Sequence, residues 1–275
     1  MTVFDDSERR TWAGRAEAYE ASFAKLCAYP VPMVLDAADV RPGTRLLDVG
    51  TGTGAVAEAA CERGAKVTAV DAEPGMVALA AQAAPGADVR VAALPDLPFA
   101  DAEFDAVVGN FVLNHVGQPR VALAELLRVT RPGGRIALTI WTAPTAAGQA
   151  LFGRALQAAG VSRPAHLPVL APEDDFARTV QGLTGLLGEA GFADPSCRTL
   201  AWDHLATAEE WWSGPATGVA TVGQVVVSQP AEVVAEIKRH YDSISTEFAG
   251  PDGVLALPQL ALLGRATARS ATTAA

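Results

Sequence analysis

The residues best suited to chemistry begin in a glycine-rich stretch at 45–54, RLLDVGTGTG. Its apolar half predicts a central strand, and Gly50, Gly52 and Gly54 allow a sharp turn that brings backbone close to a ligand. A helix over about 53–63 would leave its first N–H groups free at the same place. Asp71 ends the next strand, twenty-one residues after Gly50, and can accept both hydroxyls of a ribose. This spacing predicts a site for a nucleotide-like ligand.

The glycine turn by itself does not identify the ligand. Gly50-x-Gly52-x-x-Ala55 also satisfies the dinucleotide fingerprint, so a nicotinamide oxidoreductase is one interpretation. A glycine turn that merely connects two elements is another. Three features argue against the oxidoreductase. The strand starts near residue 45 behind a helical preface, Asp48 lies within the strand end, and the later strands carry a different set of signals.

Together with the glycine turn, sequence blocks further along the chain resemble those of the class I S-adenosylmethionine-dependent methyltransferases. Four blocks occur in the order of that family, which is more specific than any one of them. The blocks are 47–54 (LDVGTGTG), 70–76 (VDAEPGM), 97–107 (LPFADAEFDAV) and 127–135 (LRVTRPGGR). The resemblance covers residues 10–142 well and the remainder loosely.

The resemblance implies S-adenosyl-L-methionine as the cofactor. The backbone at Gly50 and Gly52 would run alongside its amino acid part, and Asp71 would hold its ribose. A tyrosine of the preface would close over the cofactor. The residues assigned to the cofactor are Tyr19, Asp48, Gly50, Thr51, Gly52, Asp71, Ala72, Met76, Ala93, Leu94, Asn110 and Val112. Many relatives bind the adenine amino group with an acid after the third strand. Here that stretch is apolar (VAAL, 91–94), which leaves backbone groups, or Asp96, for this contact.

Residues 109–116 (GNFVLNHV) follow the fourth strand and would face the methyl donor. Nucleic-acid amino methyltransferases have an Asn or Asp, two prolines and an aromatic residue here. The prolines are missing after Asn110, which favours a small metabolite over a nucleobase. His115 is the candidate general base, because imidazole titrates near neutral pH and could take a proton from a hydroxyl. The alternative is a histidine that hydrogen-bonds the backbone and packs beside the cofactor.

Aromatic side chains outside the sheet predict an apolar pocket. Trp12, Tyr19 and Phe23 recur at helical spacing in the preface and would share one face. Core packing is the commonest fate of the later aromatics, but ligand sites are mostly apolar with few polar groups. The substrate-pocket candidates are Trp141, Trp202, His204, Trp211, His240 and Tyr241. We expect His166, among prolines, to be exposed, and the histidines and cysteines show no metal-ligand spacing.

Composition predicts a soluble, cytoplasmic enzyme. Of the 275 residues, half are hydrophobic and 19% are charged, unlike a disordered chain. A net charge of −10 argues against nucleic acid as a partner. We see no signal peptide and no apolar run long enough to span a membrane. Cys27, Cys61 and Cys197 are few and unclustered, which indicates reduced thiols. The oligomeric state is open.

Strand and helix signals alternate, which predicts an α/β fold with helices on both faces of a mostly parallel sheet. The resemblance makes this sheet Rossmann-like, doubly wound and seven-stranded, with an antiparallel pair at its end. We expect strands near 45–49, 66–70, 88–92, 104–109, 134–141, 195–203 and 255–266, and helices near 7–28, 53–63, 74–84, 118–130, 145–159, 177–190 and within 207–248. The predicted parts of this single domain are an N-terminal helical lid (1–29), a core (30–203), a helical cap insertion (204–250), the last strand (251–266) and a flexible tail (267–275).

The function that these observations predict is in-line methyl transfer to a small, partly apolar metabolite, in a biosynthetic pathway. Holding donor and acceptor in line can lower the barrier by roughly 7–11 kcal/mol. Two alternatives stay open. One keeps the fold and cofactor but catalyses a cyclisation or rearrangement, and the other is the NAD-dependent oxidoreductase. A binding module without catalysis is a third, more distant class.

Overall fold

A single seven-stranded sheet organises the protein, and the computed structural model describes residues 2–269 of it. The strand order is β3-β2-β1-β4-β5-β7-β6. The first five strands are parallel, and β7 runs antiparallel to both β5 and β6. The strands are β1 Arg45–Val49, β2 Lys66–Asp71, β3 Asp88–Val91, β4 Phe104–Asn110, β5 Thr130–Trp141, β6 Ala193–Ala206 and β7 Leu255–Thr267. The predicted doubly wound α/β fold, with its closing antiparallel pair, is therefore confirmed.

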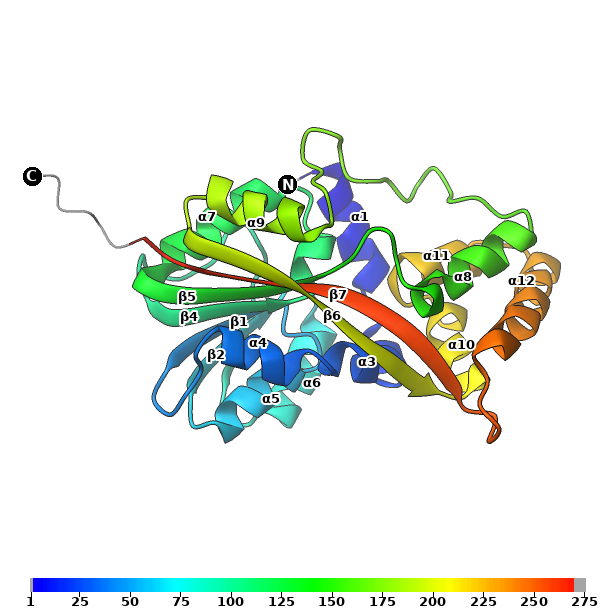
Figure 1. Ribbon diagram of the computed structural model, residues 1–275, viewed down its shortest axis with the longest axis horizontal. Coiled ribbons are helices and arrows are strands. Elements are labelled where there is room, and N and C mark those ends of the chain that lie inside the picture. The colour runs from blue at the N-terminus through cyan, green and yellow to red at the C-terminus, as the bar shows by residue number, and fades with distance from the viewer. Residues whose placement is uncertain (1, 270–275) are drawn as a thin grey trace, which may run out of the picture.

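Helices cover both faces of the sheet because successive residues of a buried strand point to opposite sides. In β1, Leu46 packs with the α4 and α5 side and Leu47 with the α7 and α9 side, and both are fully buried. Figure 1 shows α7 and α9 above the sheet and α4, α5 and α6 below it. The helices are α1 Val3–Trp12, α2 Ala16–Glu20, α3 Ala24–Ala28, α4 Val31–Ala37, α5 Ala55–Glu62, α6 Pro74–Ala83, α7 Pro119–Val129, α8 Ala147–Ala158, α9 Val180–Glu189, α10 Ala208–Ala216, α11 Ala220–Val227 and α12 Ala231–Ser245, with 3₁₀ turns η1 Val112–His115 and η2 Thr246–Phe248.

The N-terminal preface differs from the single helix predicted over 7–28. It consists of three short helices, and the chain leaves α1 through Gly14, whose φ of +67° favours glycine. The first helix also starts earlier, at Val3, because Thr2 and Asp5 form a capping box. Trp12 and Tyr19 therefore do not lie on one helical face. They still meet edge to face across the turn, with ring centroids 5.7 Å apart.

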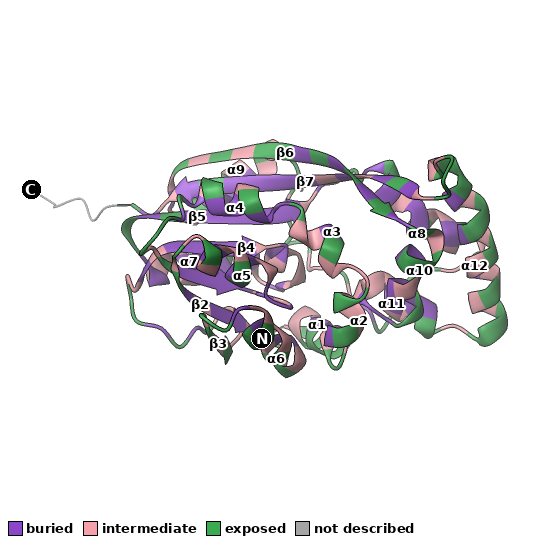
Figure 2. Ribbon diagram, turned by 90° about the horizontal axis from the view of Figure 1, so that it is seen from below, coloured by how far each residue is buried: buried purple, intermediate pink, exposed green. Residues whose placement is uncertain are grey.

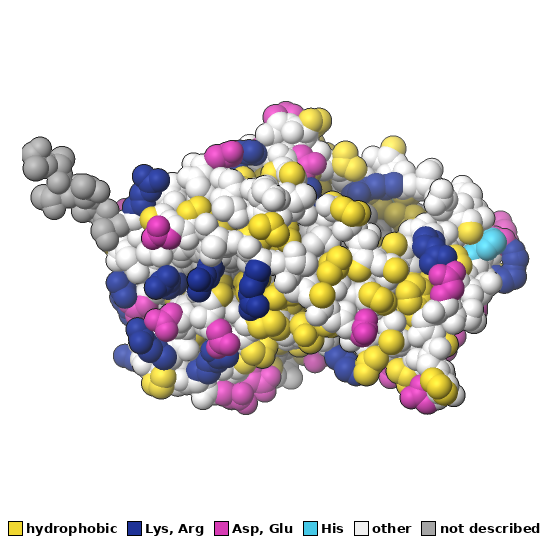
Figure 3. All heavy atoms as spheres, in the orientation of Figure 1, with side chains coloured by type: hydrophobic (Ala, Val, Ile, Leu, Met, Phe, Trp, Pro, Cys, Tyr) yellow, Lys and Arg dark blue, Asp and Glu magenta, His cyan; other side chains and the backbone are white. Residues whose placement is uncertain are grey.

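A helical cap rises beyond the carboxyl end of the sheet. The long strands β6 and β7 extend toward α8, α10, α11 and α12, which gather at one end of the molecule (Figure 1). Thr207 and Glu210 form a capping box at the start of α10, in which each side chain bonds the other residue's backbone N–H. Lysine and arginine side chains lie among acidic ones on the face shown in Figure 3, which matches the absence of dense basic runs in the sequence.

The end of the chain is more ordered than expected as far as Thr267, because this residue belongs to β7 and pairs with Arg135 of β5 and Ala193 of β6. The rest of the predicted flexible tail, from residue 270 on, lies outside the described residues. No helix within residues 2–269 is both long and apolar enough to cross a membrane.

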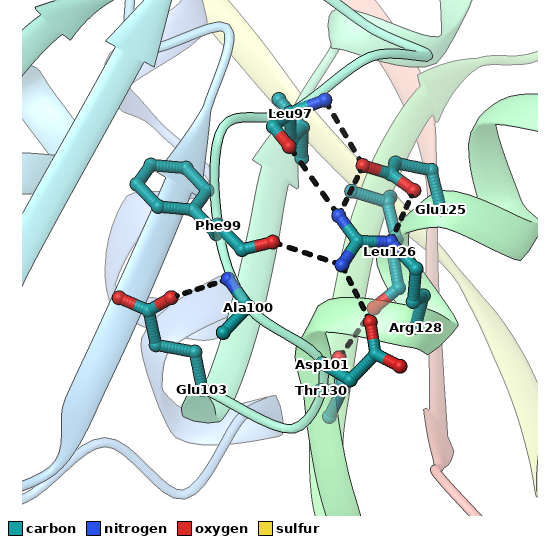
Figure 4. A network of polar contacts seen from close by, with 9 residues as sticks. All are labelled: Leu97, Phe99, Ala100, Asp101, Glu103, Glu125, Leu126, Arg128 and Thr130. Atoms are coloured by element: carbon teal, nitrogen blue, oxygen red, sulfur yellow. Dashed lines mark hydrogen bonds and ion pairs between the residues drawn. The ribbon is translucent and has the colours of Figure 1, made fainter.

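Arg128 of α7 anchors the loop that follows β3. Its guanidinium donates to the carbonyl oxygens of Leu97 and Phe99, to Asp101, and twice to Glu125 (Figure 4). Glu125 also accepts the Leu97 N–H at 2.9 Å. These charge-assisted bonds hold the pKa of the Glu125 carboxyl below its usual range. The network fixes a loop that has no regular secondary structure of its own.

We expect Arg128→Met to lower the free energy of unfolding by about 1–3 kcal/mol, because it leaves loop carbonyls and a largely buried carboxylate without their donor. Urea unfolding measures this change. Arg120→Met is the matched control on the same helix, since Arg120 is exposed and forms an ion pair with Glu189 at 3.4 Å. Equal stability of the two variants would contradict the anchoring role.

Candidate active site

A cavity of about 570 Å³ opens at the carboxyl ends of β1, β2 and β4. Here β1 has β2 on one side and β4 on the other, so the order of the strands reverses. Ligands of open α/β sheets bind at such a point. The N-terminal helices, the turns after these strands, and the cap all contribute to the cavity wall. Figure 2 shows α1, α2 and α11 next to one another at this end of the sheet.

The glycine turn has the backbone that its sequence predicts. Gly50, Gly52 and Gly54 have φ values of +69°, +56° and +100°, in the left-handed region. A Cβ atom on Gly50 would stand 2.5 Å from Cγ2 of Val112, and one on Gly54 would stand 2.8 Å from Cα of Ala80. The turn is thus packed against both η1 and α6. Only glycine permits this conformation and this packing together.

Asp71 lies at the end of β2 and lines the cavity. Its two carboxylate oxygens accept the backbone N–H groups of Gly52 at 2.9 Å and Glu73 at 3.0 Å. Burial raises the pKa of the Asp71 carboxyl, and these two backbone hydrogen bonds oppose the rise. Each carboxylate oxygen has a second lone pair, so the group can still accept hydroxyls from a ligand. The acid therefore connects the glycine turn to the cavity.

An apolar slot lies beside Asp71. Ala72, Met76, Ala93 and Leu94, all of which the sequence assigned to the cofactor, line the cavity. Asp96, the alternative acid, is not part of the lining. Its N–H bonds the carbonyl oxygen of Ala93 at 3.1 Å, which closes a tight turn.

Asp48 and Thr51 lie behind the glycine turn and do not line this cavity. The Asp48 carboxylate is fully buried and accepts the hydroxyl of Thr51 at 2.6 Å, and its second oxygen has no partner within residues 2–269. Burial raises the pKa of Asp48 to about 7, while the bond from Thr51 opposes this rise. Thr51 lines a small adjoining pocket of about 30 Å³ together with Gly50 and Gly52.

The turn after β4 joins the cavity to the preface. Asn110 lines the cavity, but its amide donates to the carbonyl oxygen of Cys27 at 2.7 Å and accepts from Thr139 at 2.6 Å. Phe111 has a left-handed φ of +62°, which costs a residue with a side chain of the order of 1–3 kcal/mol. Its ring stacks on Trp141 with the centroids 4.0 Å apart. The strained turn thus presents an aromatic wall to the cavity.

His115 lines the cavity at the end of η1, and it has a partner that the sequence did not reveal. Its Nδ1 lies 2.7 Å from Oε2 of Glu8, in α1. Trp12 packs edge-on against the imidazole, with the centroids 5.2 Å apart. Glu8 and His115 are separated by 107 positions, and no local spacing signals such a contact. The alternative, a backbone hydrogen bond from this histidine, is not what the geometry shows.

The structure divides the predicted substrate residues into two groups. Trp141 and Trp211 line the cavity, whereas four other candidates do not: Trp202, His204, His240 and Tyr241. Trp202 stacks between Tyr29 and Trp141. His204 is buried against Trp211, and burial lowers its pKa to about 4.

The other two candidates serve the cap. Tyr241 is fully buried and donates its hydroxyl to the carbonyl oxygen of Ala208, and His240 bonds Glu236 one turn earlier in α12. Helical pattern alone does not distinguish these core positions from pocket positions. Among the cavity residues that the prediction missed are Glu8, Phe111, Gln149, Phe152 and Gln259.

The residues present fit S-adenosylmethionine. The glycine turn and the carboxylate of Asp71 suit the hydroxyls and amino acid part, and the apolar slot suits the adenine ring. Asp48 provides an additional buried carboxylate oxygen without a partner among the described residues, close behind the turn.

Known proteins agree with this interpretation. A family profile described as "Methyltransferase domain" matches residues 47–138. The chain is 36% identical over 180 residues to a demethylmenaquinone methyltransferase of Beutenbergia cavernae, a match that covers 62% of this chain and 75% of that protein. It is 42% identical over 113 residues to the demethylmenaquinone methyltransferase of Renibacterium salmoninarum. This second match covers 41% of the chain and only about half (48%) of the relative.

Among solved structures, the YcgJ protein of Bacillus subtilis shares the fold, with a TM-score of 0.56 and 19% identity. The match covers 87% of this chain and 98% of that protein. The family profile and the relative of Beutenbergia cavernae show that the chain belongs to the S-adenosylmethionine-dependent methyltransferase family.

Proposed function

We propose that this protein transfers the methyl group of S-adenosylmethionine to a small aromatic ring that carries a hydroxyl group. The observation that supports this most is the continuity of the cavity. Its cofactor end, formed by the glycine turn and Asp71, opens into a chamber with aromatic walls that also contains His115. Such a chamber suits a flat, apolar acceptor better than a charged amine or a nucleic acid.

The chamber walls come from stacked aromatic pairs. Phe111 stacks on Trp141, and Phe152 stacks on Trp211 with the centroids 5.5 Å apart. Gln149 adds a polar point, because its side-chain oxygen accepts the N–H groups of Ala146 and Leu260 and so leaves its NH₂ as a donor on the wall. A ring oxygen of the acceptor suits that donor.

His115 acts as the general base in this proposal. The cofactor supplies, when bound, a sulfonium methyl group that is already a strong electrophile. Nε2 of His115 accepts the proton of the ring hydroxyl. If the oxygen attacks, the electron pair of the former O–H bond becomes the new bond between the oxygen and the methyl carbon. If a ring carbon attacks, this pair shifts into the ring, and the neighbouring carbon forms the bond to the methyl carbon instead. In both cases the C–S bond breaks and its electron pair stays on sulfur. After carbon attack, the methylated ring carbon loses its hydrogen as a proton and the ring oxygen takes one proton back from the His115 imidazolium. The aromatic hydroxyl is thereby restored, and one proton is released overall.

The relatives suggest which acceptors to test. Their names specify demethylmenaquinone, whose reduced form is a hydroxylated aromatic ring. However, Gln149, Phe152, Trp211 and Gln259 lie outside the matched segment 47–138, so the family profile covers only part of the substrate end. We therefore treat a quinol as one member of the acceptor class. Trp211 of α10 and Ala220 and Val222 of α11 contribute to the wall of this end.

The experiment is a reaction with methyl-labelled S-adenosylmethionine and a panel of naphthoquinols, phenols, aliphatic alcohols and amines, followed by mass spectrometry. We expect label in quinol or phenol products and not in amines. Label in amines alone would contradict the acceptor class. Absence of label from every product, with S-adenosylhomocysteine still bound in calorimetric titration, would instead favour a cyclisation or rearrangement. A parallel titration with NAD tests the oxidoreductase alternative.

A further inference from the structure

Helix α1 is attached to the segment that carries His115. Asp5 accepts the backbone N–H of Gly117 at 2.6 Å, two residues after the histidine. The other oxygen of Asp5 accepts the N–H and the hydroxyl of Thr2, both at 2.8 Å, and so caps the helix. One carboxylate therefore both starts α1 and docks it on the loop after η1. This docking places the next turn of α1 directly against the imidazole.

Glu8 occupies that next turn and is buried, with 8% of its surface exposed. Its Oε2 lies 2.7 Å from Nδ1 of His115 and accepts the indole N–H of Trp12 at 3.3 Å. A carboxylate at this distance favours the tautomer in which Nδ1 carries the hydrogen. Nε2 is then left with a lone pair. The imidazole is about a third exposed, on the cavity side.

We propose that Glu8 is the positioning residue of the general base. It holds His115 in the Nδ1–H tautomer, fixes the ring orientation together with Trp12, and stabilises the imidazolium that forms when Nε2 takes the substrate proton. The inference rests on the proposed function, in which His115 is that base. It also means that the base is complete only when the N-terminal helix is docked, because Glu8 lies on α1 and His115 on η1.

The test compares three variants. Glu8→Gln removes the charge and keeps the shape, Glu8→Asp keeps the charge on a shorter side chain, and Asp6→Asn is the control, an exposed acid on the same helix. We expect Glu8→Gln to lower kcat by about 10- to 100-fold, with the KM and affinity for S-adenosylmethionine changed less than about twofold. Glu8→Asp should recover part of this loss, and Asp6→Asn should match the wild type.

A spectroscopic readout separates this inference from the proposed function. ¹⁵N NMR of the histidines, assigned with His115→Ala, should show the Nδ1–H tautomer for His115 in the wild type and a shift toward Nε2–H in Glu8→Gln. An unchanged tautomer, or a Glu8→Gln variant with wild-type kcat, would overturn the positioning role. If no substrate is methylated by the wild type, the proposed function fails while the NMR experiment still decides whether Glu8 sets the tautomer.

Discussion

His115→Ala should lower kcat by about 10²–10⁴-fold, because the acceptor hydroxyl loses the group that takes its proton as the methyl arrives. The affinity for S-adenosylhomocysteine should change by less than about threefold, since all the residues predicted to contact the cofactor except Val112 lie on other elements than η1. Single-turnover rates with labelled cofactor, combined with calorimetric titration, measure the two quantities separately.

The chain offers a matched control for this prediction. His240 also bonds a glutamate, Glu236, at 2.8 Å, but it lies on α12 and does not line the cavity. His240→Ala should therefore leave kcat unchanged. Full activity of His115→Ala would show that His115 is structural, and equal losses of kcat and cofactor affinity would indicate that it supports the cofactor site.

Asp71→Ala should weaken binding of S-adenosylhomocysteine by 100-fold or more. The variant removes the acceptor of the two ribose hydroxyls, and hydrogen bonds to a charged group contribute about 1.5–3 kcal/mol each. It also removes the acceptor of the Gly52 and Glu73 N–H groups, so the glycine turn loses its tie to β2. Isothermal titration calorimetry gives the affinity.

Two further variants separate ligand binding from local unfolding. Asp71→Asn keeps one carbonyl acceptor and should bind more weakly than the wild type but better than Asp71→Ala. Asp88→Ala changes an exposed acid at the start of β3 and should bind normally. Thermal unfolding should show each variant folded at the titration temperature. Unchanged affinity in a folded Asp71→Ala protein would refute the ribose assignment.

Much of the fold follows from local sequence. Leu46 and Leu47 mark a strand buried on both sides, Pro74 and Pro119 each open a helix, and Thr207 with Glu210 opens α10. Short-range signals of this kind need only a few consecutive residues. The preface shows where they fail. The spacing of Trp12 and Tyr19 matched a helix, but Gly14 turns the chain between them.

The cofactor end of the site was predictable for the same reason. Gly50 and Gly52 follow the end of β1, and Asp71 ends β2. These two strands are parallel neighbours, so their carboxyl ends meet at one edge of the sheet. The short interval between the glycine turn and the acid therefore already implies that they meet, and the structure places both in the cavity wall.

The substrate end and the partner of His115 were decided by tertiary structure alone. Trp211 lines the cavity while Trp212, beside it on α10, packs against Tyr241 in the cap. Both are buried aromatics, and only the packing of α10 against α2 and α11 assigns one to the ligand side. Glu8 reaches His115 across 107 residues because Asp5 docks α1 on the backbone of Gly117, just after η1. Contacts between elements that are far apart in the sequence produce no repeating pattern of residues that could predict them. They are determined by which surfaces are buried when the elements pack together.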